Sequence, residues 1–554
     1  FVMSDKTISL SDIAAAEKLL GIEYSQDERE LMADNLEDLI AAAQAQRSVI
    51  FPNTLPPATT FDPRLSTTVM PASQIPISVS KVDAGSLPEN DADIAYSPVT
   101  HLSEWIRSGQ ITSRRLAEIY IDRIKTLGPK LECVVTVLED LALEEADDAD
   151  RMIADGKYLG PLHGIPYGLK DLFDTKNIQT TWGAMPYKDR IAEKDARIVT
   201  LLREAGAILV AKTTLGALAY GDIWFGGVTR NPWNIAEGAS GSSAGSASAT
   251  AAGLVGFSIG TETLGSITSP SQRCGTTGLR PTFGRVSRSG AMALCWSLDK
   301  IGPICRSVED TVLVLSAING FDSDDKGSID ASFNYDASTS TKGLRVGYIP
   351  ASFEDEGSTD VDRDALDAMR QLDVELVEVS LPELPYMSLM NVVYAEAAAA
   401  FEELTLNNRD DELAWQAKGA WPNIFRKARF LSAVDHVQLD RLRYKSMQVM
   451  DEMFSKVDFM IGPFMGPMLV ITNFTGHPCL HLRAGFCKTK TRGEASLGTG
   501  TLDTGQEDAG SETLHETPHG ISLWSGLFDE GRLCNLGVAL ENQLNVWQRR
   551  PPLG

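Results

Sequence analysis

Three polar side chains have the types and surroundings that nucleophilic catalysis needs: Lys170, Ser242 and Ser266. A serine hydroxyl is a weak nucleophile and needs a base to take its proton. No histidine is close to the two serines in the sequence, although sequence distance does not exclude one. Lys170 is an alternative base, because apolar neighbours at a strand end would exclude water from its ammonium group and lower its pKa.

A stretch rich in Gly, Ala and Ser predicts how the two serines are presented. A helix over residues 243–252 has side chains small enough to pack very close to a sheet, with Gly241 and Ser242 at its amino end. A short strand over residues 255–259 then leads into a glycine-containing turn. A turn of this kind exposes a serine hydroxyl and points successive N–H groups at one spot, as an oxyanion hole requires. The residues of this turn are Thr263, Leu264, Gly265 and Ser266.

Taken one at a time, these residues have simpler explanations. Ser266 would be a turn serine, and Ser242 would be a helix N-cap. Lys170 would be a strand-end lysine paired with Asp171, or Asp171 would tune it. Ser243 is expected to hydrogen-bond locally. Only the joint appearance of the three residues in matching contexts favours catalysis.

That context resembles a known family. The segments GPLHGIPYGLKD, NPWNIAEGASGSSAGSASATAAG and GTETLGSITSPSQRCGTTGLRPTFGRVSRSG are similar to those of the amidase signature family. The similarity covers roughly residues 98–550. It implies a Ser–cis-Ser–Lys triad of Ser266, Ser242 and Lys170, with a cis peptide bond before Ser242.

The resemblance also implies a mechanism. Neutral Lys170 takes the proton of Ser242, which takes that of Ser266, and Ser266 attacks an amide carbonyl to form an acyl-enzyme. The oxyanion is held by the backbone N–H groups of Thr263, Leu264, Gly265 and Ser266. An amide is the expected substrate, and a carbamate or an ester can be cleaved by the same triad.

Two positions depart from the family pattern. Leu264 stands where a second glycine is common, so the turn sits differently or Leu264 lines the acyl pocket. Thr268 replaces a common arginine and removes a salt-bridge partner. We expect Gly241, Tyr220 and Leu264 to bind substrate, although aromatic residues such as Tyr220, Trp224 and Phe225 more often pack in a core. Cys274 is expected in the core.

The elements around these motifs predict two regions. Residues 1–97 form an N-terminal helical extension, in which Ser11 and Asp12 cap the first helix, followed by a proline-rich extended arm over residues 51–97. Residues 98–554 form the catalytic domain. The alternation of helix and apolar strand indicates an α/β domain with a largely buried sheet. The resemblance implies a large mixed sheet flanked by helices on both faces. Residues 488–514 are expected to be a surface loop.

Individual elements of the catalytic domain are predicted from hydrophobic periodicity. Helices are expected at residues 101–107, 112–127 and 196–206. Strands are expected at residues 207–210, 346–349 and 459–461, and a strand followed by a helix at residues 520–540.

Composition excludes several classes of function. The 50 basic and 75 acidic residues give a net charge of −25, which disfavours nucleic acid as a direct ligand. Neither the seven cysteines nor the seven histidines form a metal motif, so no metal or cofactor is expected. No apolar run is long enough to span a membrane. We expect a cytoplasmic protein, and a periplasmic or secreted one if a leader has been removed.

Three functions remain to be separated. The first is a free-standing amidase acting on a small-molecule amide, and the second is the amidase subunit of a tRNA-dependent amidotransferase. The N-terminal extension and the strong acidity argue mildly against the second. The third is a non-catalytic binding protein that retains the fold. The N-terminal helices would cover the site, mediate a homodimer or simply pack on the domain.

Overall fold

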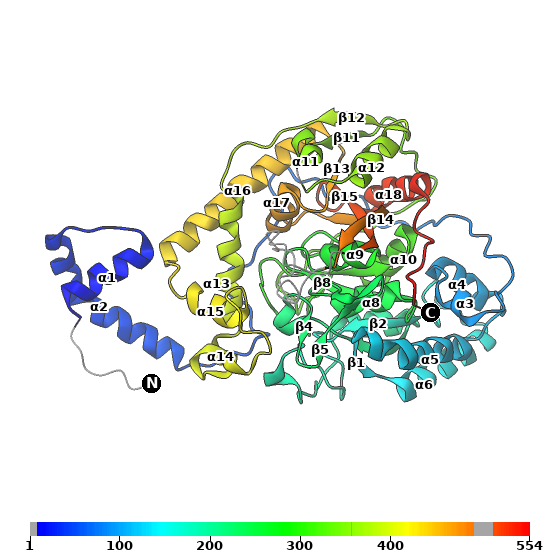
Figure 1. Cartoon of the computed structure of the whole chain (residues 1–554), viewed down its shortest axis with the longest axis horizontal. Helices are drawn as coiled ribbons and strands as arrows, with labels where there is room; N and C mark the ends of the chain where they lie inside the picture. The colour runs from blue at the N-terminus through cyan, green and yellow to red at the C-terminus, as the bar shows by residue number, and fades with distance from the viewer. Residues whose placement is uncertain (1–7, 356, 492–512, 554) are drawn as a thin grey trace.

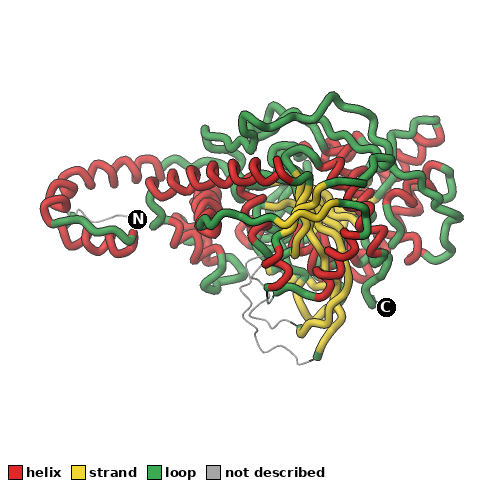
Figure 2. Tube along the Cα trace, turned by 90° about the horizontal axis from the view of Figure 1, so that it is seen from above, coloured by secondary structure: helices red, strands yellow, loops and turns green. Residues whose placement is uncertain are grey.

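A single mixed β-sheet of 11 strands forms the centre of the protein, in the order β1-β3-β2-β8-β10-β9-β14-β15-β13-β11-β12. The computed structural model describes residues 8–355, 357–491 and 513–553. Figure 2 shows the strands crossing the middle of the body with a strong twist. The strands are β1 (Val134–Val137), β2 (Pro166–Lys170), β3 (Ile208–Thr213), β8 (Phe257–Glu262), β9 (Thr277–Arg280), β10 (Lys300–Cys305), β11 (Arg345–Tyr348), β12 (Glu375–Glu378), β13 (Phe459–Pro463), β14 (Cys479–Lys490) and β15 (Leu514–Ser525).

Strands β2, β3 and β8 run parallel to one another, and β11 is parallel to both β12 and β13. The other pairs are antiparallel. Every residue of β2, β3 and β8 is buried. Parallel strands need cover on both faces, and this explains why these segments lack an exposed polar side.

Helices cover both faces of the sheet, as expected (Figure 1). In β3, Ile208 and Val210 belong to a core cluster with the helices α5, α6 and α8, whereas Leu209 belongs to the cluster that contains α7. The helices of the body are α3 (Asp91–Ala95), α4 (Val99–Arg107), α5 (Ser113–Leu131), α6 (Glu139–Ala154), α7 (Arg197–Glu204), α8 (Ala244–Ala251), α9 (Thr268–Cys274), α10 (Val308–Ile318), α11 (Pro350–Glu354), α12 (Asp360–Arg370), α13 (Met390–Ala400), α14 (Glu402–Leu406), α15 (Trp421–Ala428), α16 (Ala433–Lys456), α17 (Pro467–Thr475) and α18 (Glu530–Leu544).

Two short hairpins and four 3₁₀ turns complete the described elements. The hairpins pair β4 (Ile223–Trp224) with β5 (Gly227–Val228), and β6 (Arg230–Asn231) with β7 (Asn234–Gly238). The 3₁₀ turns are Met185–Tyr187, Ala217–Ala219, Tyr386–Leu389 and Arg409–Glu412.

The small residues of α8 let this helix lie directly on the sheet. All eight of its residues are buried. Its Gly245 N–H donates to the carbonyl of Thr214 at 3.0 Å, and the Ser246 hydroxyl donates to the carbonyl of Ile259 at 3.1 Å. Larger side chains would push the helix away and break these contacts, as the sequence predicted.

The N-terminal helices α1 (Leu10–Leu20) and α2 (Gln26–Arg47) form a hairpin that projects from the body on the side of α14 to α16 (Figure 1). The predicted cap of α1 was wrong by two positions. Ser9 is the N-cap, and Asp12 completes a capping box with it. The Arg29 and Glu17 side chains pair at 2.6 Å and join the two helices.

Between α2 and α3 the chain lies against the body as an extended arm, without a regular helix or strand in this described stretch. The Gln74 amide holds it by two hydrogen bonds to the backbone of Phe333, at 2.6 and 2.9 Å. The division of the chain at residue 97 stays a prediction.

The expected surface loop over residues 488–514 is shorter than predicted. Strand β14 continues to Lys490 and β15 begins at Leu514, because the two strands pair along their full length. The part of this prediction over residues 492–512 lies outside the described residues. Within the described ranges, no helix is both long and apolar enough to cross a membrane.

Candidate active site

Lys170 is the last residue of β2, and its ammonium group is fully buried. Its Nζ lies within hydrogen-bond distance of the hydroxyls of Ser242 at 2.8 Å, Ser243 at 2.9 Å and Thr261 at 2.8 Å. All three partners are neutral. Burial therefore lowers the pKa of Lys170 well below its usual value of 10.5. A lysine held in this way can be neutral at ordinary pH and can accept a proton.

The simpler explanation of Lys170, as a strand-end lysine paired with Asp171, was wrong. Asp171 instead lies 3.3 Å from the Lys212 ammonium and accepts a hydrogen bond from the Thr181 N–H at 2.9 Å.

Ser242 sits in a loop that is tightly packed against its neighbours. The Gly241–Ser242 peptide bond is cis, as the family resemblance implied. A Cβ atom at position 241 would lie 1.8 Å from the carbonyl oxygen of Gly221, so only glycine fits there. Ser243 fastens the loop to β8, since its hydroxyl donates to the carbonyl of Thr261 and accepts from the N–H of that residue, both at 3.1 Å.

Ser266 lies in the turn between β8 and α9 and is 8% exposed. Gly265 has φ +80°, the left-handed region that favours glycine. The carbonyls of Gly265 and Ser266 accept from Ser269 N at 2.7 Å and Ser243 N at 3.1 Å. Within the described part of the chain, no acceptor is bonded to the N–H groups of Gly265 and Ser266, and no hydrogen bond joins the Ser242 and Ser266 hydroxyls.

Glu262, at the end of β8, holds the turn that contains Ser266 in place. It is fully buried, and one carboxylate oxygen accepts from Ile267 N and Thr268 N, each at 2.9 Å. The other oxygen pairs with Arg280 at 2.7 Å and accepts from the Asn473 amide at 3.0 Å. Although burial opposes the charge, these donors lower the pKa of Glu262 to about 2. The Thr268 hydroxyl also donates to Glu262, at 2.6 Å.

A second carboxylate fixes the start of the turn. The Thr263 hydroxyl donates to Asp299 at 2.6 Å, and the Asp299 carboxylate also accepts from Leu294 N and Cys295 N at 2.8 and 3.0 Å. The buried Lys300 ammonium donates to the Thr263 carbonyl at 3.3 Å.

Thr261, Glu262, Asp299 and Lys300 were all missed from the sequence. The only signal was the adjacency of Thr261 and Glu262 to the turn.

A small pocket of about 50 Å³ opens beside Ser266, and its walls are mostly apolar. Gly241, Tyr220 and Leu264 all line it, so the three positions expected to bind substrate lie together. Leu264 keeps a negative φ because Gly265 makes the sharp bend, which leaves the leucine side chain on the pocket wall. The other described residues of the wall are Ala219, Gly221, Thr263, Leu294, Met390, Val393, Tyr394, Trp421 and Ile424.

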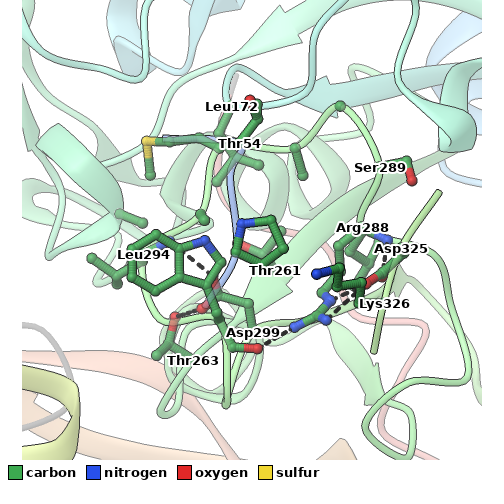
Figure 3. A pocket seen from close by; sticks show the side chains of 18 of the residues that line it. Thr54, Leu172, Thr261, Thr263, Arg288, Ser289, Leu294, Asp299, Asp325 and Lys326 are labelled. Carbon is green, nitrogen blue, oxygen red and sulfur yellow. Dashed lines mark hydrogen bonds and ion pairs between the residues drawn. The ribbon is translucent and has the colours of Figure 1, made fainter. Parts of the chain in front are cut away.

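A larger cavity of about 220 Å³, drawn in Figure 3, adjoins this pocket. The two share Ala219, Thr263 and Leu294. It is more polar than the pocket. Its described charged residues are Arg288, Asp299, Asp324, Asp325 and Lys326.

Other candidates lie elsewhere. The Trp224 and Phe225 rings meet edge to face, with centroids 4.9 Å apart, and line neither of the two cavities. Cys274 is buried in a core cluster, as expected. No histidine lines either cavity in the part of the chain that is described. The described residues also include no cluster of three His, Cys, Asp or Glu side chains able to hold a metal ion.

The chain is similar to proteins of one family along most of its length. The family model described as Amidase matches residues 115–533. The chain is 30% identical over 501 residues to a glutamyl-tRNA(Gln) amidotransferase subunit from Prochlorococcus marinus, covering 81% of this chain and 98% of that protein. It is 32% identical over 488 residues to the protein of the same name from Pseudomonas savastanoi, covering 82% and 99%. The crystal structure of the native peptide amidase of Stenotrophomonas maltophilia matches with a TM-score of 0.68 and 27% identity, covering 82% and 98%.

The role of Glu262 predicts a linked loss of stability and of Ser266 reactivity. In Glu262→Gln the amide cannot neutralise the buried Arg280, which we expect to cost about 3 kcal/mol of unfolding free energy. In the native protein the Glu262–Arg280 ion pair contributes its full stabilisation above pH 4.5. This contribution to the free energy of unfolding is lost as the pH falls toward the pKa of Glu262 in the folded state, about 2. Urea unfolding between pH 3 and pH 7 should therefore show a smaller acid-dependent loss of stability in the variant.

The buried pair Arg285–Glu530, at 2.8 Å, offers a matched control. Glu530→Gln should destabilise the protein similarly while Ser266 still reacts with a serine-directed fluorophosphonate. Glu262→Gln should react at least about tenfold more slowly in the folded state. Equal reactivity of the two variants would contradict a role for Glu262 in holding the turn.

Proposed function

The chain belongs to the amidase family, and on that premise we propose that it hydrolyses the C–N bond of an amide through an acyl-enzyme on Ser266. The observation that supports this most is the buried Lys170, which contacts Ser242 at 2.8 Å and has no carboxylate partner among its described hydrogen bonds. A neutral amine in this position is a base without an obligatory counter-ion.

In this mechanism the proton moves in two steps. Ser242 gives its proton to Lys170 Nζ and takes the proton of Ser266, while Ser266 Oγ forms a bond to the substrate carbonyl carbon. The tetrahedral intermediate then breaks its C–N bond, and the relay returns a proton to the leaving amine. Water cleaves the ester by the same route and releases the acid. The step requires the Ser242 and Ser266 hydroxyls to come within hydrogen-bond distance of each other.

The oxyanion is assigned to the backbone N–H groups of Thr263, Leu264, Gly265 and Ser266. Preorganised donors of this kind lower the barrier because they need no rearrangement during reaction. Glu262 and Asp299 supply that preorganisation, since each carboxylate holds one end of the turn.

The two cavities define the substrate. Gly241, Tyr220 and Leu264 would contact its apolar group in the small pocket, where Trp421 adds an aromatic wall. The charged cavity next to it would take a polar group. The proposed substrate is therefore a non-peptide amide with an apolar group on one side of the scissile bond and a polar group on the other.

A second candidate is the amidase subunit of a tRNA-dependent amidotransferase. It is favoured by the relatives of that name, which match 81% and 82% of this chain. Such a subunit would cleave glutamine and work with partner subunits.

We also propose an organisation of the chain into an extension over residues 1–97 and a catalytic domain over residues 98–554. The protein would act in the cytoplasm and would not contact nucleic acid directly. A homodimer and a non-catalytic binding role are the remaining proposals.

Replacing the nucleophile should abolish both turnover and labelling. We expect Ser266→Ala to lower amide turnover by more than about a thousandfold and to prevent reaction with a fluorophosphonate. Ser271→Ala is a matched control, because its buried hydroxyl makes no hydrogen bond within the described chain. Labelling of Ser266→Ala, read by mass spectrometry, would show that another serine is the nucleophile.

The pH dependence of kcat/KM should follow the protonation state of Lys170. Because only the neutral amine accepts a proton, kcat/KM should rise with pH through the lowered pKa of Lys170 and then level off. Lys170→Arg should lose at least about a hundredfold in kcat/KM, since a guanidinium stays protonated. A profile of the native enzyme without this ascending limb would contradict the assignment of Lys170.

The two candidate functions differ in what the isolated chain does. A free-standing amidase should release amine from an apolar–polar amide at rates that added partner subunits do not change. An amidotransferase subunit should hydrolyse glutamine only weakly until its partners are present. Ammonia release from glutamine, compared with amine release from a panel of anilides and primary amides, separates them.

A further inference from the structure

The N-terminal arm reaches the 220 Å³ cavity, called the inner cavity below, and Asn53 fixes it there. The Asn53 amide donates to the carbonyl of Ala293 at 2.7 Å and accepts from the N–H of the same residue at 2.8 Å. It also donates to the carbonyl of Ala400 at 3.4 Å, and the Trp296 indole donates to the Asn53 carbonyl at 3.3 Å. These contacts join the arm to the segment that lines the 220 Å³ cavity.

A second anchor lies eight residues further along. The Phe61 ring meets Phe283 edge-on, with centroids 5.1 Å apart, and the Arg443 guanidinium lies 3.4 Å from its centroid. Between the two anchors the chain contains Pro56 and Pro57, which restrict its backbone. The stretch from Asn53 to Phe61 is thus held at both ends.

This held stretch forms part of the cavity walls. Thr54 and Pro56 line the 220 Å³ cavity, where Figure 3 shows Thr54 facing the same space as Thr261 and Thr263. Thr261 is a partner of Lys170, and Thr263 begins the nucleophile turn. The arm therefore bounds the space next to the catalytic groups.

A third cavity, of about 550 Å³, continues outward under the arm toward α16. It shares Pro56, Arg288, Trp296, Asp325 and Lys326 with the inner cavity. The three cavities thus adjoin in series, and the pocket at Ser266 is the smallest of them. Charged residues of both signs line the outermost cavity, including Asp62, Arg64, Glu396 and Asp440.

We propose that the arm between Asn53 and Phe61 is a wall of the substrate site, and that it selects amides whose polar group is extended enough to run beneath it. This rests on the proposed function of Ser266. A compact amide would be held in the pocket beside Ser266, which no described residue of the arm lines, and would not depend on the arm. An extended polar amide would gain contacts along the arm, and its affinity would depend on Asn53.

The test compares Asn53→Ala with Gln74→Ala in the full chain. Gln74 is a matched control because its amide also joins the arm to one residue by two hydrogen bonds, and it lines none of the three cavities. The substrates are a compact anilide and two amides extended by a diglycine unit, one on the acyl side and one on the amine side.

We expect Asn53→Ala to raise KM about tenfold for one or both extended amides, with kcat and the compact anilide changed less than about twofold. Gln74→Ala should leave all three substrates within about twofold. Thr54→Trp, at an exposed position on the wall of the inner cavity, should also weaken the extended amides by crowding that cavity. An equal loss for compact and extended amides, no loss, or the same loss in Gln74→Ala would overturn the proposal.

A binding measurement keeps this result separate from failure of the proposed function. In a Ser266→Ala background, calorimetry with the same extended amides should give a Kd about tenfold weaker when Asn53→Ala is added and unchanged when Gln74→Ala is added. If the native protein neither turns over amides nor reacts with a fluorophosphonate, the proposed function fails, and the Kd comparison still decides the role of the arm. An unchanged Kd in the Asn53 variant would refute that role.

Discussion

A buried ammonium group surrounded by hydroxyls is the constraint on which the rest of the site depends. Desolvation of an isolated cation is costly, and proteins usually offset it with a carboxylate. Around Lys170 the described hydrogen-bond partners are Ser242, Ser243 and Thr261, so burial lowers the pKa of the ammonium group and favours the neutral amine. This requires dry surroundings, which the close packing of α8 on the fully buried strands β2 and β8 supplies.

The Glu262 carboxylate supports the turn and does not pair with Lys170. The alternation of side chains along β8 points Glu262 to the face opposite Lys170. Thr261 faces Lys170, and the next residue, Glu262, points to the opposite side, where it meets Arg280 and the amides that start α9. One strand end thus provides a neutral partner for the base and a charged support for the nucleophile turn. A shift of one residue in the register between β8 and β10 would exchange the two environments.

The three segments of the proposed triad could be recognised in the sequence because each is local. Lys170, Ser242 and Ser266 each lie within a short contiguous segment, and the helix of residues 243–252 was predicted within one residue of α8 at each end. The supporting groups could not, because their partners are remote: Thr261 and Lys170 are 91 residues apart, and Asn53 and Ala293 are 240 apart. Tertiary pairing also overrode composition at residues 488–490, where a Thr- and Lys-rich segment continues β14.

The proposed wall of the inner cavity, the arm from Asn53 to Phe61, belongs to the same polypeptide as the rest of the site. This affects how substrate selectivity responds to dilution of the enzyme. A wall supplied by a separate chain would dissociate as the concentration fell below its Kd. Here Asn53 is followed in the same chain by further contacts with the body at Phe61 and Gln74, so docking of the wall is an intramolecular event whose effective concentration is set by the connecting chain. Selectivity should therefore be the same at nanomolar and at micromolar enzyme, whatever the state of association of the N-terminal helices.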